Sequence, residues 1–279
     1  MQTLNMSSVW KKAALVLAVA GAPVFSAQAA NLFTVAPSVL GGPAAAFISP
    51  AISGTSSSRI TATGATTVAG QGFIQFTAFN DPLGGALDPG VTGLNASYRL
   101  WLTYNYTATL QGGSPGFGAA QSFFNVNSLT FTVFGQQGLA TTFTQASLAN
   151  AAVVNVGAGV LQTLGTGSLM SGTAGLNGPL GGTPTGAFFN TSTSYLNTIF
   201  GNSFFIAPSP FYTMAFNSVT NTGPGLLIDA VNGVIAINQQ VGNAEFAAVN
   251  IVPTPSSLAL VGLALLAAGF IARRKSKMN

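Results

Sequence analysis

The sequence of 279 residues contains no cysteine and no histidine. Without cysteine the chain has no disulfides, thiol nucleophiles or thiolate metal ligands. Without histidine it cannot carry Ser-His-Asp catalysis, and it lacks the usual zinc and iron ligand. Only 4% of the residues are charged, against about 25% in an ordinary globular domain. The exterior of the folded body must therefore consist mostly of serine, threonine, asparagine, glutamine and glycine.

The few charges are unevenly distributed along the chain. Six of the eight basic residues lie in the terminal segments, namely Lys11, Lys12, Arg273, Arg274, Lys275 and Lys277. Between those segments, Arg59 and Arg99 oppose Asp81, Asp88, Asp229 and Glu245. The body is slightly acidic and has no basic patch, so we expect no nucleic-acid partner.

Residues 1–29 have the pattern of a secretory signal peptide. Lys11 and Lys12 precede an apolar run, and Ala27 and Ala29 form a small-x-small cleavage site, which predicts signal peptidase cleavage before Ala30. A transmembrane anchor is the alternative, although the apolar run is short for a membrane span.

Residues 253–279 predict one C-terminal transmembrane helix. Proline has no N–H and a fixed φ, so a helix begins only after Pro255. The uncharged run 256–272 would extend about 25 Å as a helix. That length can cross a bilayer core of about 30 Å with local thinning. The basic residues that follow favour a cytoplasmic C-terminus. A buried core helix is disfavoured, because the run has no polar face. A permanent membrane anchor remains an alternative, because it has the same architecture as a sorting signal.

The order of these elements resembles the PEP-CTERM sorting signal of Gram-negative bacteria. The resemblance rests on Val252, Pro253, Thr254 and Pro255, the apolar run 256–272 and the terminal basic cluster. The family has glutamate between the two prolines, where this chain has Thr254. The resemblance implies export, processing by the membrane enzyme exosortase, and association with exopolysaccharide in a biofilm or floc matrix. It places the protein in the inner membrane in transit, and then at the cell surface or in the extracellular matrix.

The body, residues 30–252, has the alternation of β-strands. In the segment 98–110 the residues Tyr98, Leu100, Leu102, Tyr104, Tyr106, Ala108 and Leu110 fall on one face. Further strands are predicted at 72–79, 128–135, 211–219 and 245–252, and a hairpin at 226–238 around Asn232-Gly233, which is typical of a type I′ turn. Glycine-rich loops are predicted at 80–90, 111–120 and 166–186. Short strands without helical crossovers predict an all-β, antiparallel β-sandwich-like single domain.

Three short segments of the body are similar to the flocculation-associated PEP-CTERM proteins. They are 33-FTVAP-37, 98-YRLWLTY-104 and 204-FFIAPSPFYTMAFNSVTNT-222.

Several side chains are candidates for binding. Asp81 and Asp88 lie in one predicted loop and could supply oxygen ligands to calcium, but Asn-Asp-Pro and Asp-Pro-Gly are also ordinary turn formers. Asp229 interrupts an apolar strand, either as an edge charge that discourages aggregation or as a binding residue. Arg99 and Trp101 share the polar face of the best strand, where they either contact a glycan or partner or are covered by another sheet.

The chain does not have the pattern of an enzyme. A glycosidase needs two carboxylates positioned across a sugar, and nothing in the sequence brings two of the four acids together. We therefore expect no catalysis and no cofactor. An almost uncharged, hydroxyl- and amide-rich surface suits many weak hydrogen bonds to extracellular polysaccharide.

Overall fold

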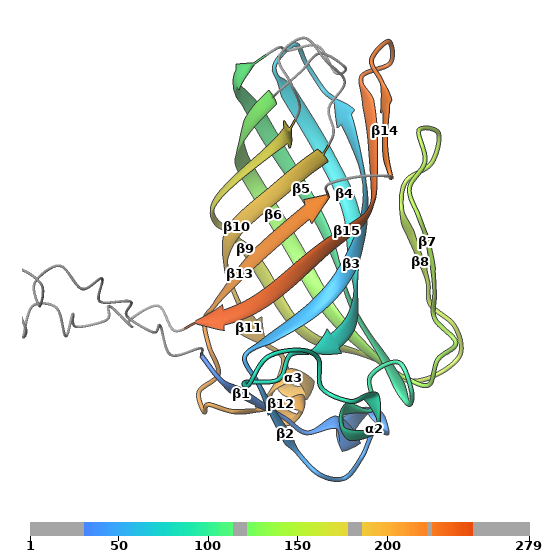
Figure 1. Ribbon diagram of the computed structural model, residues 1–279, viewed down its shortest axis with the longest axis vertical. Coiled ribbons are helices and arrows are strands. Elements are labelled where there is room, and N and C mark those ends of the chain that lie inside the picture. Colours follow the sequence, from blue (N-terminus) through green and yellow to red (C-terminus); the bar gives the residue numbers. More distant parts are fainter. Residues whose placement is uncertain (1–30, 114–121, 178–185, 222–224, 248–279) are drawn as a thin grey trace, which may run out of the picture. The chain divides into compact units, whose positions relative to one another are not determined.

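Strands make up most of the residues that the computed structural model describes, which are 31–113, 122–177, 186–221 and 225–247 (Figure 1). These residues belong to one compact unit. The strands are β1 (Phe33–Val35), β2 (Phe47–Ser49), β3 (Ala51–Ala62), β4 (Thr67–Phe79), β5 (Tyr98–Gly113), β6 (Ser122–Gln137), β7 (Thr142–Thr144), β8 (Val153–Asn155), β9 (Leu161–Asn177), β10 (Gly186–Ser194), β11 (Leu196–Asn197), β12 (Phe205–Ala207), β13 (Met214–Asn221), β14 (Leu226–Asp229) and β15 (Val234–Ala247). The helical turns are η1 (Pro37–Leu40), α2 (Pro89–Thr92) and α3 (Ile199–Phe204).

The main sheet closes on itself. Its strands follow the order β3, β4, β5, β6, β9, β10, β13 and β15, and every neighbouring pair is antiparallel. The ring is completed by β15, which pairs with β3 over 51–61. Figure 1 shows these strands surrounding a common interior. We call the boundary between β3 and β15 the seam.

The all-β, antiparallel class predicted from the sequence is confirmed, but the sandwich arrangement differs from the structure. A sandwich has two sheets packed face to face, whereas here one sheet supplies both walls of the core. The difference has a physical reason. Alternation shows that a strand has one buried face, and that face looks the same in a sandwich and in a closed sheet.

The inner face carries the apolar core. The predicted face of β5 is confirmed, with Tyr98, Leu100, Leu102, Tyr104, Tyr106 and Ala108 all buried. Tyr106 pairs with Gly70 on the neighbouring strand β4, where an added Cβ would come within 2.3 Å of the tyrosine ring. Gly70 therefore makes room for an aromatic ring inside the closed sheet.

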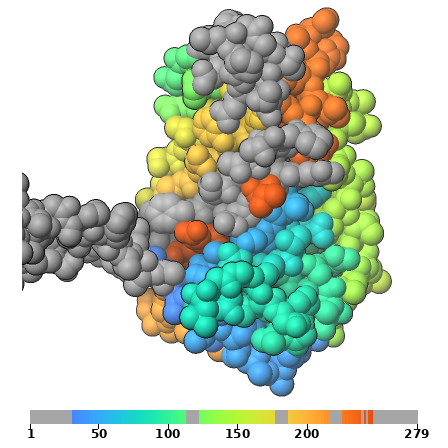
Figure 2. Space-filling model, in the orientation of Figure 1, coloured from blue at the N-terminus to red at the C-terminus, as the bar shows by residue number. Residues whose placement is uncertain are grey.

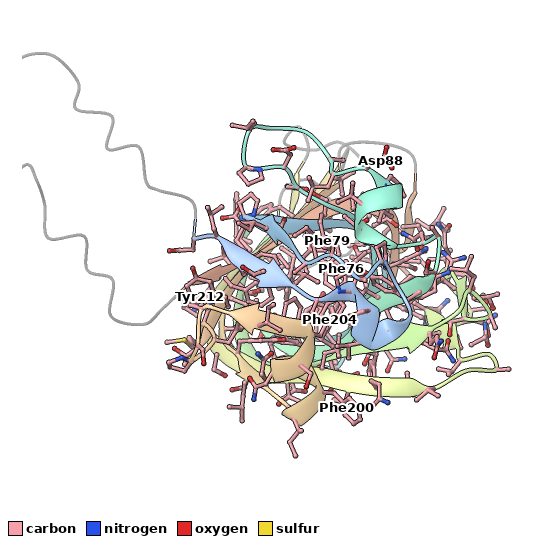
Figure 3. All side chains as sticks on the ribbon, turned by 90° about the horizontal axis from the view of Figure 1, so that it is seen from below. Phe76, Phe79, Asp88, Phe200, Phe204 and Tyr212 are labelled. Atoms are coloured by element: carbon pink, nitrogen blue, oxygen red, sulfur yellow. The ribbon has the colours of Figure 1, made fainter. Side chains whose placement is uncertain are left out.

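One end of the ring is filled by aromatic side chains. The Phe33 ring of β1 lies 5.9 Å from Phe205, 6.2 Å from Phe211 and 5.3 Å from Phe246. The small sheet β12-β1-β2 covers this end, and α3 leads directly into it. Figure 3, seen from below, shows Phe204 pointing inward and Phe200 pointing outward.

A strap, defined as residues 138–160, crosses the outside of the ring. It contains the two-stranded sheet β7-β8. Figure 2 shows this yellow-green segment along the side of the body. Its Phe143 ring lies 5.2 Å from Phe73 of β4 and 6.1 Å from Trp101 of β5.

One local prediction is wrong and another is confirmed only in part. Most of the loop expected at 166–186 is part of β9, which runs to Asn177. Its glycines mislead the sequence analysis because they leave space for rings, as at Gly165, where a Cβ would lie 2.4 Å from the Tyr195 hydroxyl. The hairpin is confirmed, because β14 pairs with β15 on either side of residues 230–233. Its turn is not of type I′, which requires a positive φ at both central residues. Of Asn232 and Gly233, only Gly233, at φ 62°, has a positive φ.

Among the described segments, no helix combines the length and the apolar character needed to cross a membrane.

Burial inside the ring changes the ionisation of tyrosine. It raises the pKa of Tyr104 to about 12, although hydrogen bonds with Ser58 and Ser56 act in the opposite direction. Burial also raises the pKa values of Tyr98, Tyr106 and Tyr195. The folded state favours the neutral phenols. This stabilisation is complete below the ordinary pKa of about 10 and is lost as the pH rises through the folded-state values.

We expect alkaline titration to separate one tyrosine from the other four. Tyr212 is partly exposed and ionises first, although its pKa is also raised by burial. The remaining four of the five tyrosines ionise only as the protein unfolds, at about pH 11 or above. Ultraviolet tyrosinate absorbance, recorded together with circular dichroism, measures both events. Tyr212→Phe should remove only the early phase. Ionisation of several tyrosines near pH 10 with native circular dichroism would contradict the buried arrangement.

Candidate functional site

A polar groove lies on the outer face of the ring over β3, β4, β5 and β6. Its volume is about 490 Å³. The polar side chains that line it are Arg59, Thr61, Gln71, Asn105, Thr107, Ser128 and Thr130. Ala69 lines the same hollow with a side chain that is too small to fill it, and the backbone of Gly70 also borders it.

Strand register brings the polar side chains of the groove together. Arg59 pairs with Gln71, and Gln71 pairs with Asn105 on the next strand. Asn105 in turn pairs with Thr130. Directly paired residues of neighbouring strands point to the same face. The result is a continuous polar row across four strands.

A second row lies beside the first. Thr61 pairs with Ala69, which pairs with Thr107, which pairs with Ser128. The hydroxyl oxygens of Thr107 and Ser128 are 2.7 Å apart and hydrogen-bonded. Two parallel rows of hydroxyls and amides therefore face solvent across the groove.

Arg59 is held at the boundary between the groove and the strap. Its Nε and Nη2 donate to the carbonyl oxygen of Leu148, at 3.2 and 3.1 Å. A carbonyl carries no net charge, so these bonds orient the guanidinium without neutralising it. The strap thus positions the one cationic side chain that lines the groove.

The lining of the groove is suited to hydrogen bonding. It offers amides, hydroxyls and a guanidinium, which donate and accept hydrogen bonds in several directions. No carboxylate lines it among the described residues. A ligand rich in hydroxyl groups matches this lining.

Arg99 and Trp101, for which the sequence left open a glycan or partner contact, lie on the outer face of β5, and Trp101 is covered. Trp101 is 1% exposed, and its ring lies 5.7 Å from Phe134 and 6.1 Å from Phe143 of the strap. Arg99 donates from Nη1 to Asn95 Oδ1 at 2.9 Å, while its Nε is buried without a hydrogen-bond partner. The β7-β8 sheet covers Trp101, in line with the alternative that the sequence left open, whereas Arg99 is bonded to an asparagine.

A hydrogen-bonded latch holds the tip of the strap on the seam. The Ser57 hydroxyl of β3 donates to Asn238 Oδ1 of β15 at 2.6 Å. The same oxygen of Ser57 accepts from the Ala146 N–H at 2.8 Å, and Asn238 Nδ2 donates to the Ala146 carbonyl at 2.9 Å. The sequence analysis missed these residues, because a serine and an asparagine 181 positions apart carry no local signal of contact.

The predicted acidic candidates all serve turns. Asp81 accepts from the Leu83 N–H at 2.8 Å, and Asp88 caps α2 by accepting from the Gly90 N–H at 2.6 Å. Asp229 accepts from the side chain of Asn232 at 2.7 Å and from its backbone N–H at 3.0 Å, and these bonds lower the pKa of its carboxyl. Within the described segments, no three potential metal ligands gather.

The remaining predicted site residues lie outside the described residues. They are Ala27 and Ala29 of the cleavage site, Val252, Pro253, Thr254 and Pro255 of the sorting motif, and Arg273, Arg274, Lys275 and Lys277 of the basic end.

No protein-family model, curated protein or solved structure matches this chain.

Replacing Phe143 with alanine should uncover Trp101 and loosen the strap. The substitution removes two ring contacts, which contribute about 1–3 kcal/mol to the free energy of unfolding. In a Trp10→Phe background Trp101 is the remaining tryptophan. Its emission should then move to longer wavelength and become more accessible to acrylamide. Leu139→Ala is the control, because Leu139 lies in the strap but is exposed. Unchanged emission from the Phe143 variant would show that the strap does not protect Trp101.

Proposed function

We propose that the protein is an exported component of an extracellular matrix that binds neutral polysaccharide in the outer polar groove. The observation that carries the binding proposal is the double row of hydroxyl and amide side chains along this groove. Each pyranose unit offers several hydroxyls, and a neutral chain avoids the desolvation of fixed charges. Binding of this kind is weak at one site and becomes strong when many copies act on one long chain.

The terminal sequences support the route to this location. The signal peptide pattern of residues 1–29 supports export. The Pro253-Thr254-Pro255 motif, the apolar run 256–272 and the basic end support delivery through the inner membrane and release by exosortase. A permanently membrane-anchored, periplasm-facing binding domain is the alternative, and it would use the same groove.

Intact mass of the protein from its native host distinguishes the two versions. Sorting predicts a chain that starts near Ala30, ends near Pro253 and lies in the extracellular or surface fraction. A chain that extends to Asn279 in the inner-membrane fraction would contradict release and favour the permanent anchor.

Removing an amide from the groove should weaken polysaccharide binding. Gln71→Ala and Asn105→Ala each remove hydrogen bonds worth about 0.5–1.5 kcal/mol, which corresponds to about 2- to 13-fold in affinity. Affinity electrophoresis of the mature protein, in gels that contain exopolysaccharide from the host, measures the change. Dextran serves as a second neutral polysaccharide and alginate as an anionic one.

The chain offers a matched control for this experiment. Asn125 is another exposed asparagine of the ring, and it does not line the groove. Asn125→Ala should therefore bind as the parent protein does. Equal affinity of the Asn105 and Asn125 variants would rule out the groove as the binding site. A parent protein that host exopolysaccharide does not retard would overturn the binding proposal itself.

A further inference from the structure

The end of the ring covered by the small sheet exposes apolar side chains from two neighbouring elements. Across the small sheet, Phe33, Phe47 and Phe205 face inward and are buried, whereas Ile48 and Ile206 face outward. Leu32 precedes the sheet and is also exposed.

The second group comes from the segment that leads into β12. Leu196 is 71% exposed and Ile199 is 86% exposed, and Phe200 is about half exposed. Figure 3 shows Phe200 pointing away from the body. We call the six residues the apolar end surface; they are Leu32, Ile48, Leu196, Ile199, Phe200 and Ile206. None of them is charged. Exposed apolar side chains gathered at one end of a body are typical of an interaction surface.

The position at which the described chain ends identifies what this surface meets. The Phe246 ring lies 5.3 Å from Phe33 and 5.6 Å from Phe205, so β15 ends beside the small sheet. Only residues 248–255 separate its last residue, Ala247, from the run 256–272. Eight residues reach at most about 28 Å. A membrane that holds the run therefore lies within about that distance of Ala247, which ends β15 beside the small sheet.

We infer that the apolar end surface contacts the lipid bilayer while the C-terminal run is still in the membrane. This inference rests on the part of the proposed function that inserts residues 256–272 into the inner membrane. The surface carries no lysine or arginine, so the contact is with the acyl and glycerol region and does not depend on anionic lipid. Docking fixes the height of the ring above the membrane and leaves the groove facing the polysaccharide.

The absence of cysteine allows a direct test by site-directed spin labelling. Single-cysteine variants of the full chain are labelled with a nitroxide and reconstituted in phosphatidylcholine nanodiscs. Collisions with oxygen, which concentrates in lipid, are compared with collisions with a water-soluble nickel chelate. The variants Leu196→Cys and Ile199→Cys report on the surface, and Ala264→Cys reports on the C-terminal run.

Val231→Cys is the control in water. Val231 is 94% exposed in the turn that precedes β15, at the opposite end of that strand from Ala247. The strand has 14 residues at about 3.3 Å each, so its two ends are separated by about 45 Å along the strand.

We expect the ratio of oxygen to nickel accessibility to be several-fold higher at Leu196 and Ile199 than at Val231, and unchanged by salt. The lipid contact would be overturned if the probe at Ala264 lies in lipid while the probes at Leu196 and Ile199 are accessible to nickel. That result would leave the sorting proposal standing. A probe at Ala264 in water would overturn both. If the probes at Leu196 and Ile199 are shielded from both oxygen and nickel and their spectra show spin–spin broadening, a second copy of the protein covers the surface. That result would also overturn the inference.

Discussion

Hydrogen bonds along the seam between β3 and β15 are the constraint on which the rest of the structure depends. They join strands at opposite ends of the described chain and convert an open sheet into a ring. A ring leaves no long edge strand unpaired, so it needs no charges to guard against edge-to-edge association. Closure of the ring therefore removes one reason for charged side chains at the surface. This is consistent with the small number of charged residues in the body. It also gives the outer face its fixed curvature, on which both the groove and the strap lie.

The sequence predicts the local features of this fold and not its closure. The alternation at 98–110 predicts β5 and its inner face correctly, because strand period is a local property. The glycines of β9 were wrongly interpreted as loop signals, because their role is to accommodate rings such as Tyr195 that come from elsewhere in the chain. β4, one partner of β3, follows it directly in the sequence, whereas β15, the partner that closes the ring, lies near the other end of the described chain.

The candidate site shows the same division between local and long-range information. The outward positions of Gln71 and Asn105 follow from alternation, but their adjacency to Arg59 and Thr130 depends on the register of four strands. The position of Trp101 on the outer face of β5, together with Arg99, follows from the alternation of this strand. Phe143, which covers Trp101, lies on a segment whose sequence gives no sign that it folds back over the ring.

The latch at the tip of the strap depends on the closure of the ring. Ala146, from the middle of the chain, bonds to Ser57 and Asn238 only where β3 and β15 already lie side by side. Contacts so distant in sequence form late, because loop closure must come first. The strap also contacts β3, β4 and β5 alone, through Arg59, Phe73 and Trp101. The complete latch, with the Asn238 bond, is therefore the part of the strap that registers whether the first and last ring strands are paired.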